Sequence, residues 1–216
     1  MTPRVVAIDG AAGSGKSTLA RLLAERLGLP YVNTGSMYRA LTLQARRAGV
    51  DVEDEVALTR VMGTLTFTLS PSPGSELWID GAPASDDLET ADVESAVSTV
   101  AKHPAVRTAM RAAQRELGEG GAVMEGRDIG TAVFPDAPVK LYLVAEAEER
   151  AGRRAEERAG PGAAGALLER DRLDERVNPF VPAPDAVVLD TSDLDVEATL
   201  RAALDAVAAR APELLT

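Results

Sequence analysis

One nine-residue stretch, Gly10–Thr18, constrains this chain more than any other part of its sequence. It fits the pattern G-x-x-x-x-G-K-[ST], in which glycines let successive backbone N–H groups turn toward one anion. The helix that follows adds the positive end of its dipole. Lys16 can then reach the β- and γ-phosphates of a nucleotide, and Ser17 can ligate Mg²⁺. We therefore expect the whole loop to bind phosphate: Gly10, Ala11, Ala12, Gly13, Ser14, Gly15, Lys16, Ser17 and Thr18.

The flanks of this loop have the pattern that such a motif requires. Val5–Ile8 is a short apolar run, typical of a buried strand, and leucines recur at helical spacing from Leu19 to Leu27. A flexible Gly/Ser turn is the alternative, but a chance match is expected on the order of once per hundred chains of this length. The order strand, loop, helix favours a phosphate-binding loop.

Strand-like and helix-like segments alternate along most of the chain. Strands are expected at residues 5–8, 31–33, 122–125, 139–144 and 187–190, with helices between them. This alternation predicts an α/β fold with a parallel, doubly wound, five-stranded sheet and helices on both faces. Ligands of such sheets bind at the carboxyl ends of the strands, where the candidate motifs of this chain all follow a strand.

Residues 63–85 interrupt the alternation. Leu65–Leu69 alternates apolar and polar residues, and a Pro/Gly/Ser turn separates it from a second strand-like run at Leu77–Gly81. We interpret residues 1–216 as one domain that carries an inserted small antiparallel β subdomain within residues 34–100. The acidic residues 86–94 are expected to form a solvated connector.

The composition excludes several classes of function. The net charge of −11 disfavours a nucleic-acid-binding protein, the absence of cysteine excludes thiolate catalysis, and a single histidine, His103, disfavours a serine–histidine triad. No apolar run approaches 18 residues, and the N-terminus lacks the apolar stretch of a signal peptide. We expect a cytoplasmic protein with neither a membrane nor a nucleic-acid partner.

A second phosphate site is indicated by Thr34-Gly35-x-x-x-Arg39, just past the second strand. A helix N-terminus and an arginine one turn later can hold a phosphate, although a capped helix with a surface arginine has the same pattern. Placed one strand after a phosphate loop, the motif resembles the acceptor-phosphate site of nucleoside monophosphate kinases.

Further motifs narrow this resemblance. They are Gly126-Arg127-Asp128-Ile129-Gly130-Thr131-x-Val133-Phe134-Pro135, Arg170-Asp171-x-x-Asp174 with Pro179 beyond it, and Asp185–Thr191. Together with the hairpin they make the chain similar, over nearly its whole length, to the bacterial cytidylate kinases. The resemblance implies phosphorylation of CMP and dCMP by ATP with Mg²⁺, in a monomeric enzyme.

The resemblance also implies roles for single residues. Arg39 and Arg127 would clamp the phosphate of CMP, Asp128 would accept from the cytosine amino group, and Ser98 and Arg107 would donate to the ring nitrogen and carbonyl. Uracil reverses part of that pattern and should bind worse. The implied acceptor site comprises Thr34, Tyr38, Arg39, Ser98, Arg107, Arg127, Asp128, Arg170, Asp174 and Arg176, with Arg170 and Asp174 on the ribose.

Each of these assignments has a plainer alternative. Ser98 can be an ordinary helical serine, Arg127 and Asp128 can pair with each other, and Arg107 shares a face with Arg111 and Arg115 that can be a solvated basic stripe. His103 is given no role.

Residues 150–176 resemble the lid of these kinases. Of the arginines at 150, 153, 154 and 158, Arg153 and Arg154 are expected to contact ATP, although interleaved glutamates would also suit a salt-bridged surface helix. The expected catalytic residues are Lys16, Arg127 and Arg154. Arg176 departs from the family pattern, because it follows Asp174 by two residues where three are usual.

Two other functions remain open at this point. One is a kinase for another small acceptor, such as UMP, AMP or a non-nucleotide. The other is a nucleotide-dependent switch, but the sequence has no N-K-x-D motif of the kind that reads guanine.

Overall fold

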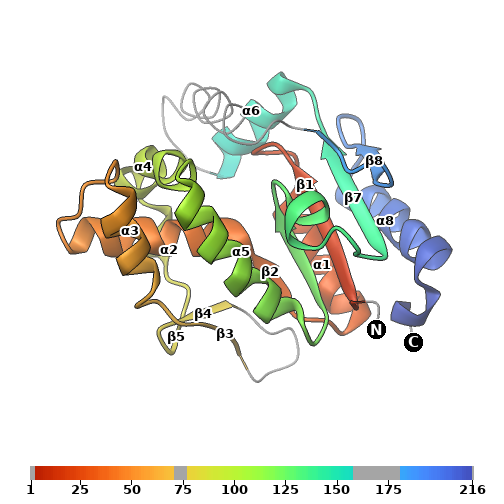
Figure 1. The fold of residues 1–216 in the computed structure, drawn as a ribbon. Coiled ribbons are helices and arrows are strands. Elements are labelled where there is room, and N and C mark those ends of the chain that lie inside the picture. Colours follow the sequence, from red (N-terminus) through yellow and green to blue (C-terminus); the bar gives the residue numbers. More distant parts are fainter. Residues whose placement is uncertain (1–2, 71–76, 158–180, 216) are drawn as a thin grey trace.

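The computed structural model describes residues 3–70, 77–157 and 181–215 and is built around one parallel sheet (Figure 1). The sheet has five strands in the order β2-β6-β1-β7-β8. Their bounds are β1 Val5–Gly10, β2 Tyr31–Asn33, β6 Ala122–Gly126, β7 Val139–Val144 and β8 Val187–Asp190. The predicted fold class is therefore confirmed.

Register between the strands brings distant segments side by side. β1 pairs with β6 so that Ile8 lies opposite Glu125 and Asp9 opposite Gly126. All pairs in this sheet are parallel, so the carboxyl ends of the strands lie along one edge. The segments after Gly10 and Gly126 consequently start next to each other although they are more than a hundred residues apart in the chain.

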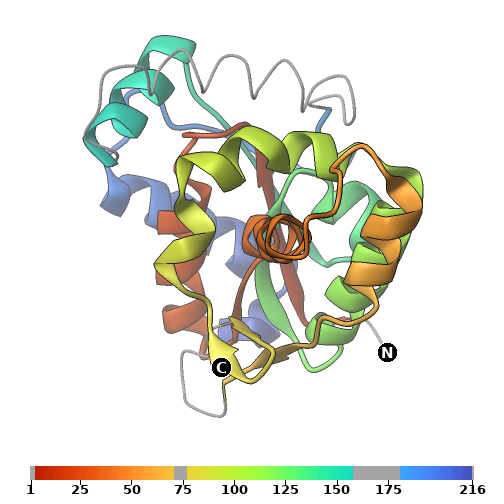
Figure 2. The same ribbon diagram turned by 90° about the vertical axis from the view of Figure 1, so that its left-hand side faces the viewer.

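Helices cover both faces of the sheet. The main helices are α1 Lys16–Leu27, α2 Thr34–Arg47, α3 Glu55–Met62, α4 Ala91–Ala101, α5 Pro104–Gly118, α6 Ala147–Glu157 and α8 Val196–Arg210. Shorter helical turns are η1 Asp86–Glu89, η2 Ile129–Val133 and η3 Pro212–Leu215. Figure 2 looks along α2, which packs beside the sheet with α4 and α5 around it. No helix in the described ranges is long and apolar enough to cross a membrane.

Alternation along β1 divides the core into two clusters. Val6 and Ile8 pack with α1 and α8, whereas Val5 and Ala7 pack with α2 and α5 on the opposite face. Side chains of a strand point to opposite faces in turn, so a strand that is buried on both sides reads as an uninterrupted apolar run. This explains why Val5–Ile8 has no polar residue.

The expected antiparallel insertion is present as a three-stranded sheet, β3 Phe67–Leu69, β4 Leu77–Ile79 and β5 Ala82–Pro83. β4 and β5 are joined by Asp80-Gly81, both with positive φ (52° and 79°). Two left-handed residues form the tight turn whose twist matches a hairpin, and Asp-Gly is a preferred pair there. Leu77 reaches the cluster that also contains Val5, so this sheet shares the main core.

The expectation of a solvated connector at residues 86–94 holds only in part: most of these residues are exposed, but they are largely helical and some of them turn inward. Residues 86–89 form η1, and α4 begins at Ala91. Within this stretch, the Glu94 side chain is only 14% exposed and lies 3.8 Å from the guanidinium of Arg39. A buried cation needs a nearby anion, so part of this acidic stretch folds inward.

Candidate active site

The phosphate-binding loop leads from β1 into α1 and is shaped by its glycines. Gly13 and Gly15 have φ of +74° and +87°, and a Cβ on Gly13 would lie 2.8 Å from the carbonyl oxygen of Arg150. Only glycine adopts this shape without strain. Lys16 Nζ donates to Ala11 O at 2.6 Å, so its ammonium group lies folded over the loop.

Two arginines of α6 lie against the loop and its neighbour. Arg150 donates to Ala12 O at 3.0 Å, and Arg153 donates to Thr191 Oγ1 at 3.1 Å. They are therefore not simply members of a salt-bridged surface helix. Arg154 belongs to α6, but its side chain lies outside the described part of the structure, as do Arg158, Arg170, Asp174 and Arg176.

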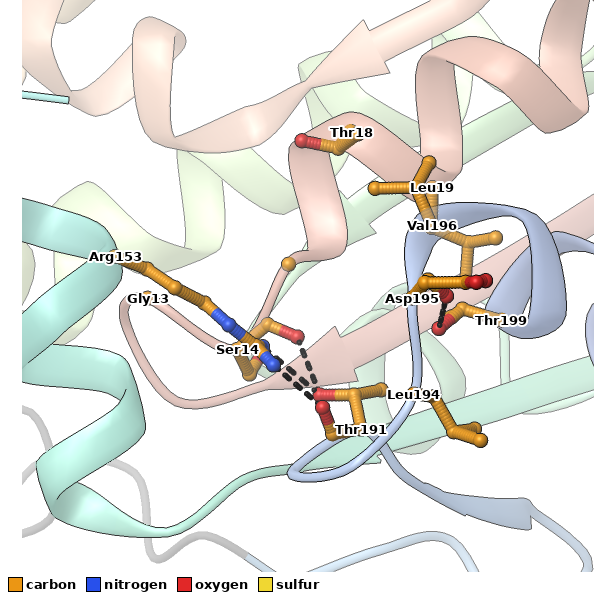
Figure 3. A pocket seen from close by; sticks show the side chains of 11 residues that line it. Gly13, Ser14, Thr18, Leu19, Arg153, Thr191, Leu194, Asp195, Val196 and Thr199 are labelled. Carbon is orange, nitrogen blue, oxygen red and sulfur yellow. Dashed lines mark hydrogen bonds between the residues drawn. The ribbon is translucent and has the colours of Figure 1, made fainter. Parts of the chain in front are cut away.

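Beside the first turn of α1 there is a cavity of about 560 Å³ (Figure 3). Thr18 and Leu19 line one side, and Leu194, which precedes α8, and Val196, its first residue, line the other. The full lining is Gly13, Ser14, Gly15, Thr18, Leu19, Arg153, Thr191, Leu194, Asp195, Val196 and Thr199. Its size and mixed lining suit a small organic ligand. The sequence predicted a ligand site at the phosphate loop, but it did not indicate that residues 191–199 line the same cavity.

A buried carboxylate, Glu125, meets the start of α1. Glu125 is 3% exposed, accepts a hydrogen bond from Ser17 Oγ at 3.0 Å and accepts another from the Tyr31 hydroxyl at 2.5 Å. Burial and the neighbouring Glu125 raise the pKa of Tyr31, so its hydroxyl stays protonated and donates. A serine hydroxyl and a carboxylate are hard oxygen ligands, the type that Mg²⁺ prefers.

The acceptor side begins at α2. Asn33 caps this helix by accepting from Ser36 N at 3.1 Å, and Thr34 Oγ1 donates to Glu125 O at 2.7 Å. Arg39 is 8% exposed and lies 3.7 Å from Glu89 and 3.8 Å from Glu94. The alternative of an ordinary surface arginine is therefore wrong.

Asp9 joins the two halves of the site. Its two carboxylate oxygens accept from the backbone N–H groups of Ile129 and Gly130, each at 2.8 Å. Burial raises the pKa of Asp9 to about 6, against the opposing effect of these hydrogen bonds. Arg127, between β6 and this turn, donates to Gly10 O at 3.0 Å. The acceptor turn is thus bonded to the strand that carries the phosphate loop.

Asp128 is held by two arginines of α5. Arg107 Nη2 and Arg111 Nη2 donate to the same oxygen, Oδ2, at 2.7 and 2.6 Å. The suggested pair between Arg127 and Asp128 is therefore not what the structure shows. Tyr38 lies close enough to this cluster for its charges to act on the phenol, whose pKa burial raises to about 12.

The idea of a solvated basic stripe on α5 is also wrong. The Arg107 side chain is only 14% exposed, and Arg115 donates to the carbonyl oxygens of Ala132 and Val133. Ser98 is buried on α4 at 6% exposure. His103 packs with its Nε2 2.9 Å from Val52 O.

Three residues of the site were missed from the sequence: Asp9, Arg111 and Glu125. Asp9 and Glu125 each directly precede the last glycine of a buried strand. Acidic residues at the carboxyl ends of adjacent parallel strands were the available signal. For Arg111 the only signal in the sequence was its position four residues after Arg107, which places both on one face of a helix.

Comparisons with known proteins point to one family. The family model described as cytidylate kinase matches residues 6–209. The chain is 48% identical to the cytidylate kinase of Geobacillus thermodenitrificans (strain NG80-2) over 203 residues, covering 89% of this chain and 91% of the relative. It is 45% identical to the cytidylate kinase of Mycobacterium avium (strain 104) over 202 residues, covering 88% of this chain and 89% of the relative.

A solved structure supports the fold alone. A gluconokinase from Sinorhizobium meliloti 1021 superposes with a TM-score of 0.55 at 16% identity, covering 99% of this chain and 96% of that chain. The family itself follows from the sequence matches. This chain belongs to the cytidylate kinase family.

Proposed function

We propose that this protein transfers the γ-phosphoryl group of ATP to CMP or dCMP and releases ADP with CDP or dCDP. The observation that carries the proposal is the acceptor turn. Asp9 bonds it to the strand of the phosphate loop, and it presents Arg127 and Asp128 directly after β6. A phosphate-binding group and a base-reading group therefore stand next to the donor loop.

The donor half would hold ATP by its phosphates and its nucleoside. The glycine-shaped loop and Lys16 suit the triphosphate, because backbone N–H groups and one ammonium group neutralise its charge. The 560 Å³ cavity beside Thr18 is of a size for the nucleoside, with the Arg153 guanidinium at its edge. Arg154 is assigned to the transferring phosphoryl group by its place in the same helix.

Mg²⁺ would be held by Ser17, with Glu125 next to it as a second hard oxygen group. When bound, such an ion neutralises charge on the β- and γ-phosphate oxygens. Tyr31 keeps the Glu125 carboxylate in place by donating to its other oxygen.

The acceptor half would bind the phosphate of CMP through Arg39 and Arg127, because guanidinium groups make paired hydrogen bonds to phosphate oxygens. Asp128 would accept from the cytosine amino group, and Ser98 and Arg107 would donate to the acceptors on the same edge of the base. Thr34 and Tyr38 complete the wall of this site. Arg170, Asp174 and Arg176 are assigned to the ribose side on their sequence positions alone.

Phosphoryl transfer in this site needs positioning and charge neutralisation. The acceptor phosphate is already ionised, so it attacks without a general base. Lys16 and Arg127 would stabilise the oxygens of the transferring group, where negative charge must be neutralised. Closure of the lid at 150–176 and of the insertion at 34–100 would exclude water, which otherwise hydrolyses ATP.

The test is an ADP-release assay with CMP, dCMP, UMP, AMP and GMP as acceptors, each with Mg²⁺ and ATP. Turnover should be highest with CMP or dCMP, and Asp128→Ala should lose most of the preference over UMP. Equal ADP release with and without every acceptor would point to a nucleotide-dependent switch. A preference for UMP or AMP would identify a kinase for another acceptor.

The monomeric state and the cytoplasmic location stay predictions. Sedimentation at micromolar concentration and cell fractionation would test them separately from the activity.

A further inference from the structure

Two arginines share one oxygen of Asp128. Arg107 and Arg111 lie one turn apart on α5, and both donate to Oδ2, at 2.7 and 2.6 Å. Neither donates to Oδ1, which within the described part of the chain is left for a further donor. Two charge-assisted hydrogen bonds to Oδ2 restrict the rotation of the carboxylate, so the direction of Oδ1 is restricted as well.

That Arg107 and Arg111 both bond Asp128 is important because Arg107 is also proposed to bind the base. In the proposed function its guanidinium donates to the ring nitrogen and carbonyl of cytosine. An Arg107 that turns toward the base weakens its own bond to Asp128 at the moment when that carboxylate must receive the amino group. Arg111 has no such competing assignment and can keep its bond to Oδ2.

Among the described residues, the Arg111 side chain makes one hydrogen bond, the one to Asp128. Val106 and Met110 anchor α5 in the core, with no exposed surface. The Arg111 side chain is 31% exposed, and its Nε is buried with no hydrogen-bond partner in the described residues. Its link to Asp128 is thus the bond that orients it, and the pair lies next to the phenol of Tyr38.

We infer that Arg111 is a specificity-determining positioning residue, which holds the Asp128 carboxylate in the orientation that accepts cytosine and refuses uracil. It acts through Asp128 and does not touch the base. The inference rests on the proposed function, because it names how that acceptor site distinguishes its substrate. A carboxylate facing uracil meets a carbonyl oxygen at that position, and two acceptors cannot pair.

The experiment measures kcat and KM for CMP, UMP and ATP in the wild type and in Arg111→Met and Arg111→Lys. For Arg111→Met we expect KM for CMP to rise on the order of tenfold, which corresponds to one charge-assisted hydrogen bond. The CMP-to-UMP ratio of kcat/KM should fall by about as much, with KM for ATP within about twofold. Arg111→Lys should recover part of the ratio, because it restores the charge but not the geometry.

Two controls separate this role from a structural one. Arg115→Met removes the next arginine of the same face, which bonds backbone carbonyls and not Asp128, and should leave the CMP-to-UMP ratio unchanged. In an Asp128→Asn background, Arg111→Met should change the ratio little further, because its target is gone.

The outcomes distinguish the inference from the function on which it rests. A wild type that prefers CMP, together with an Arg111→Met variant of unchanged ratio and CMP affinity, overturns the inference alone. A wild type without CMP kinase activity overturns the proposed function. Should Arg111→Met fail to fold, Arg111→Lys and its double variant with Asp128→Asn carry the same comparison, and additive effects there count against the inference.

Discussion

The hydroxyl of Ser17 donates a hydrogen bond across 3.0 Å to the carboxylate of Glu125, which ties the first turn of α1 to the end of β6. Replacing this carboxylate by an amide, Glu125→Gln, keeps the shape but removes the charge beside the proposed Mg²⁺ ligand. We expect the Mg²⁺ concentration for half-maximal activity to rise on the order of tenfold, as when a charged hydrogen-bonding partner is lost. Calorimetry of ADP binding with and without Mg²⁺ should show a smaller Mg²⁺-dependent gain.

Tyr31→Phe is the matched control for that prediction. It removes the hydrogen bond to the other Glu125 oxygen and leaves the Ser17 contact in place. Its requirement for Mg²⁺ should shift less than that of Glu125→Gln. Equal Mg²⁺ dependence in wild type and Glu125→Gln would show that Glu125 has no part in the metal site.

Loss of Arg39, a cation on the acceptor side, should weaken the binding of CMP with little effect on the binding of ATP. Arg39→Met should raise KM for CMP by roughly 10- to 100-fold, the range for hydrogen bonds to a charged group, with little change in KM for ATP. Arg46→Met, on the same helix but paired with Asp92 at the surface, should change neither constant by much. Steady-state kinetics with each substrate varied in turn measures both, and a parallel rise in KM for ATP would contradict the assignment.

Asp9 should make stability depend on pH in an unusual direction. Because burial raises its pKa from 3.8 to about 6, the folded state binds the proton more tightly than the unfolded state. The stability that Asp9 contributes is therefore complete below about pH 4 and is lost as pH rises through about 6. Denaturant unfolding of wild type and Asp9→Asn should give a difference in unfolding free energy that falls over this interval, by on the order of 3 kcal/mol.

The same carboxylate should affect substrate binding. A protonated Asp9 accepts more weakly from Ile129 and Gly130, because one of its oxygens then carries a proton, so the turn that carries Arg127 and Asp128 loosens. KM for CMP in the wild type should rise as the pH falls below 6. In Asp9→Asn, KM for CMP should be higher than in the wild type at neutral pH and should change less with pH. Parallel KM profiles for the two proteins would refute this link.

Arg153 should act on the donor side. Its guanidinium borders the cavity beside α1 and bonds Thr191, so Arg153→Met removes a cation and a wall of the proposed nucleoside site. We expect KM for ATP to rise on the order of tenfold with KM for CMP unchanged. Arg201→Met, an exposed arginine of α8 paired with Glu197, serves as the neutral comparison. A rise in KM for CMP with KM for ATP unchanged would contradict the assignment of Arg153 to the ATP side.

Local patterns in the sequence predicted the framework well because each depends on neighbours in the chain. The bounds of β2, β7 and β8 agree with the strands expected from the sequence, and α1 contains the leucines that recur at helical spacing from Leu19 to Leu27. The insertion was visible as period-two alternation, and membership of the cytidylate kinase family followed from motifs whose residues are contiguous. Within residues 86–94, the inward position of Glu94 was not expected, because acidity alone does not show that a buried cation lies opposite.

By itself, then, the sequence determined the phosphate loop, the order of strands and helices, and the list of charged residues from which the site is made. Only the tertiary structure decided how those charges pair. The spacing of Arg107 and Arg111 placed them on one helical face, but the turn after β6 decided that Asp128 is what they meet. The partners of Asp9 and Ser17 lie more than a hundred residues away, and strand pairing, which no local pattern encodes, brings them within hydrogen-bond distance.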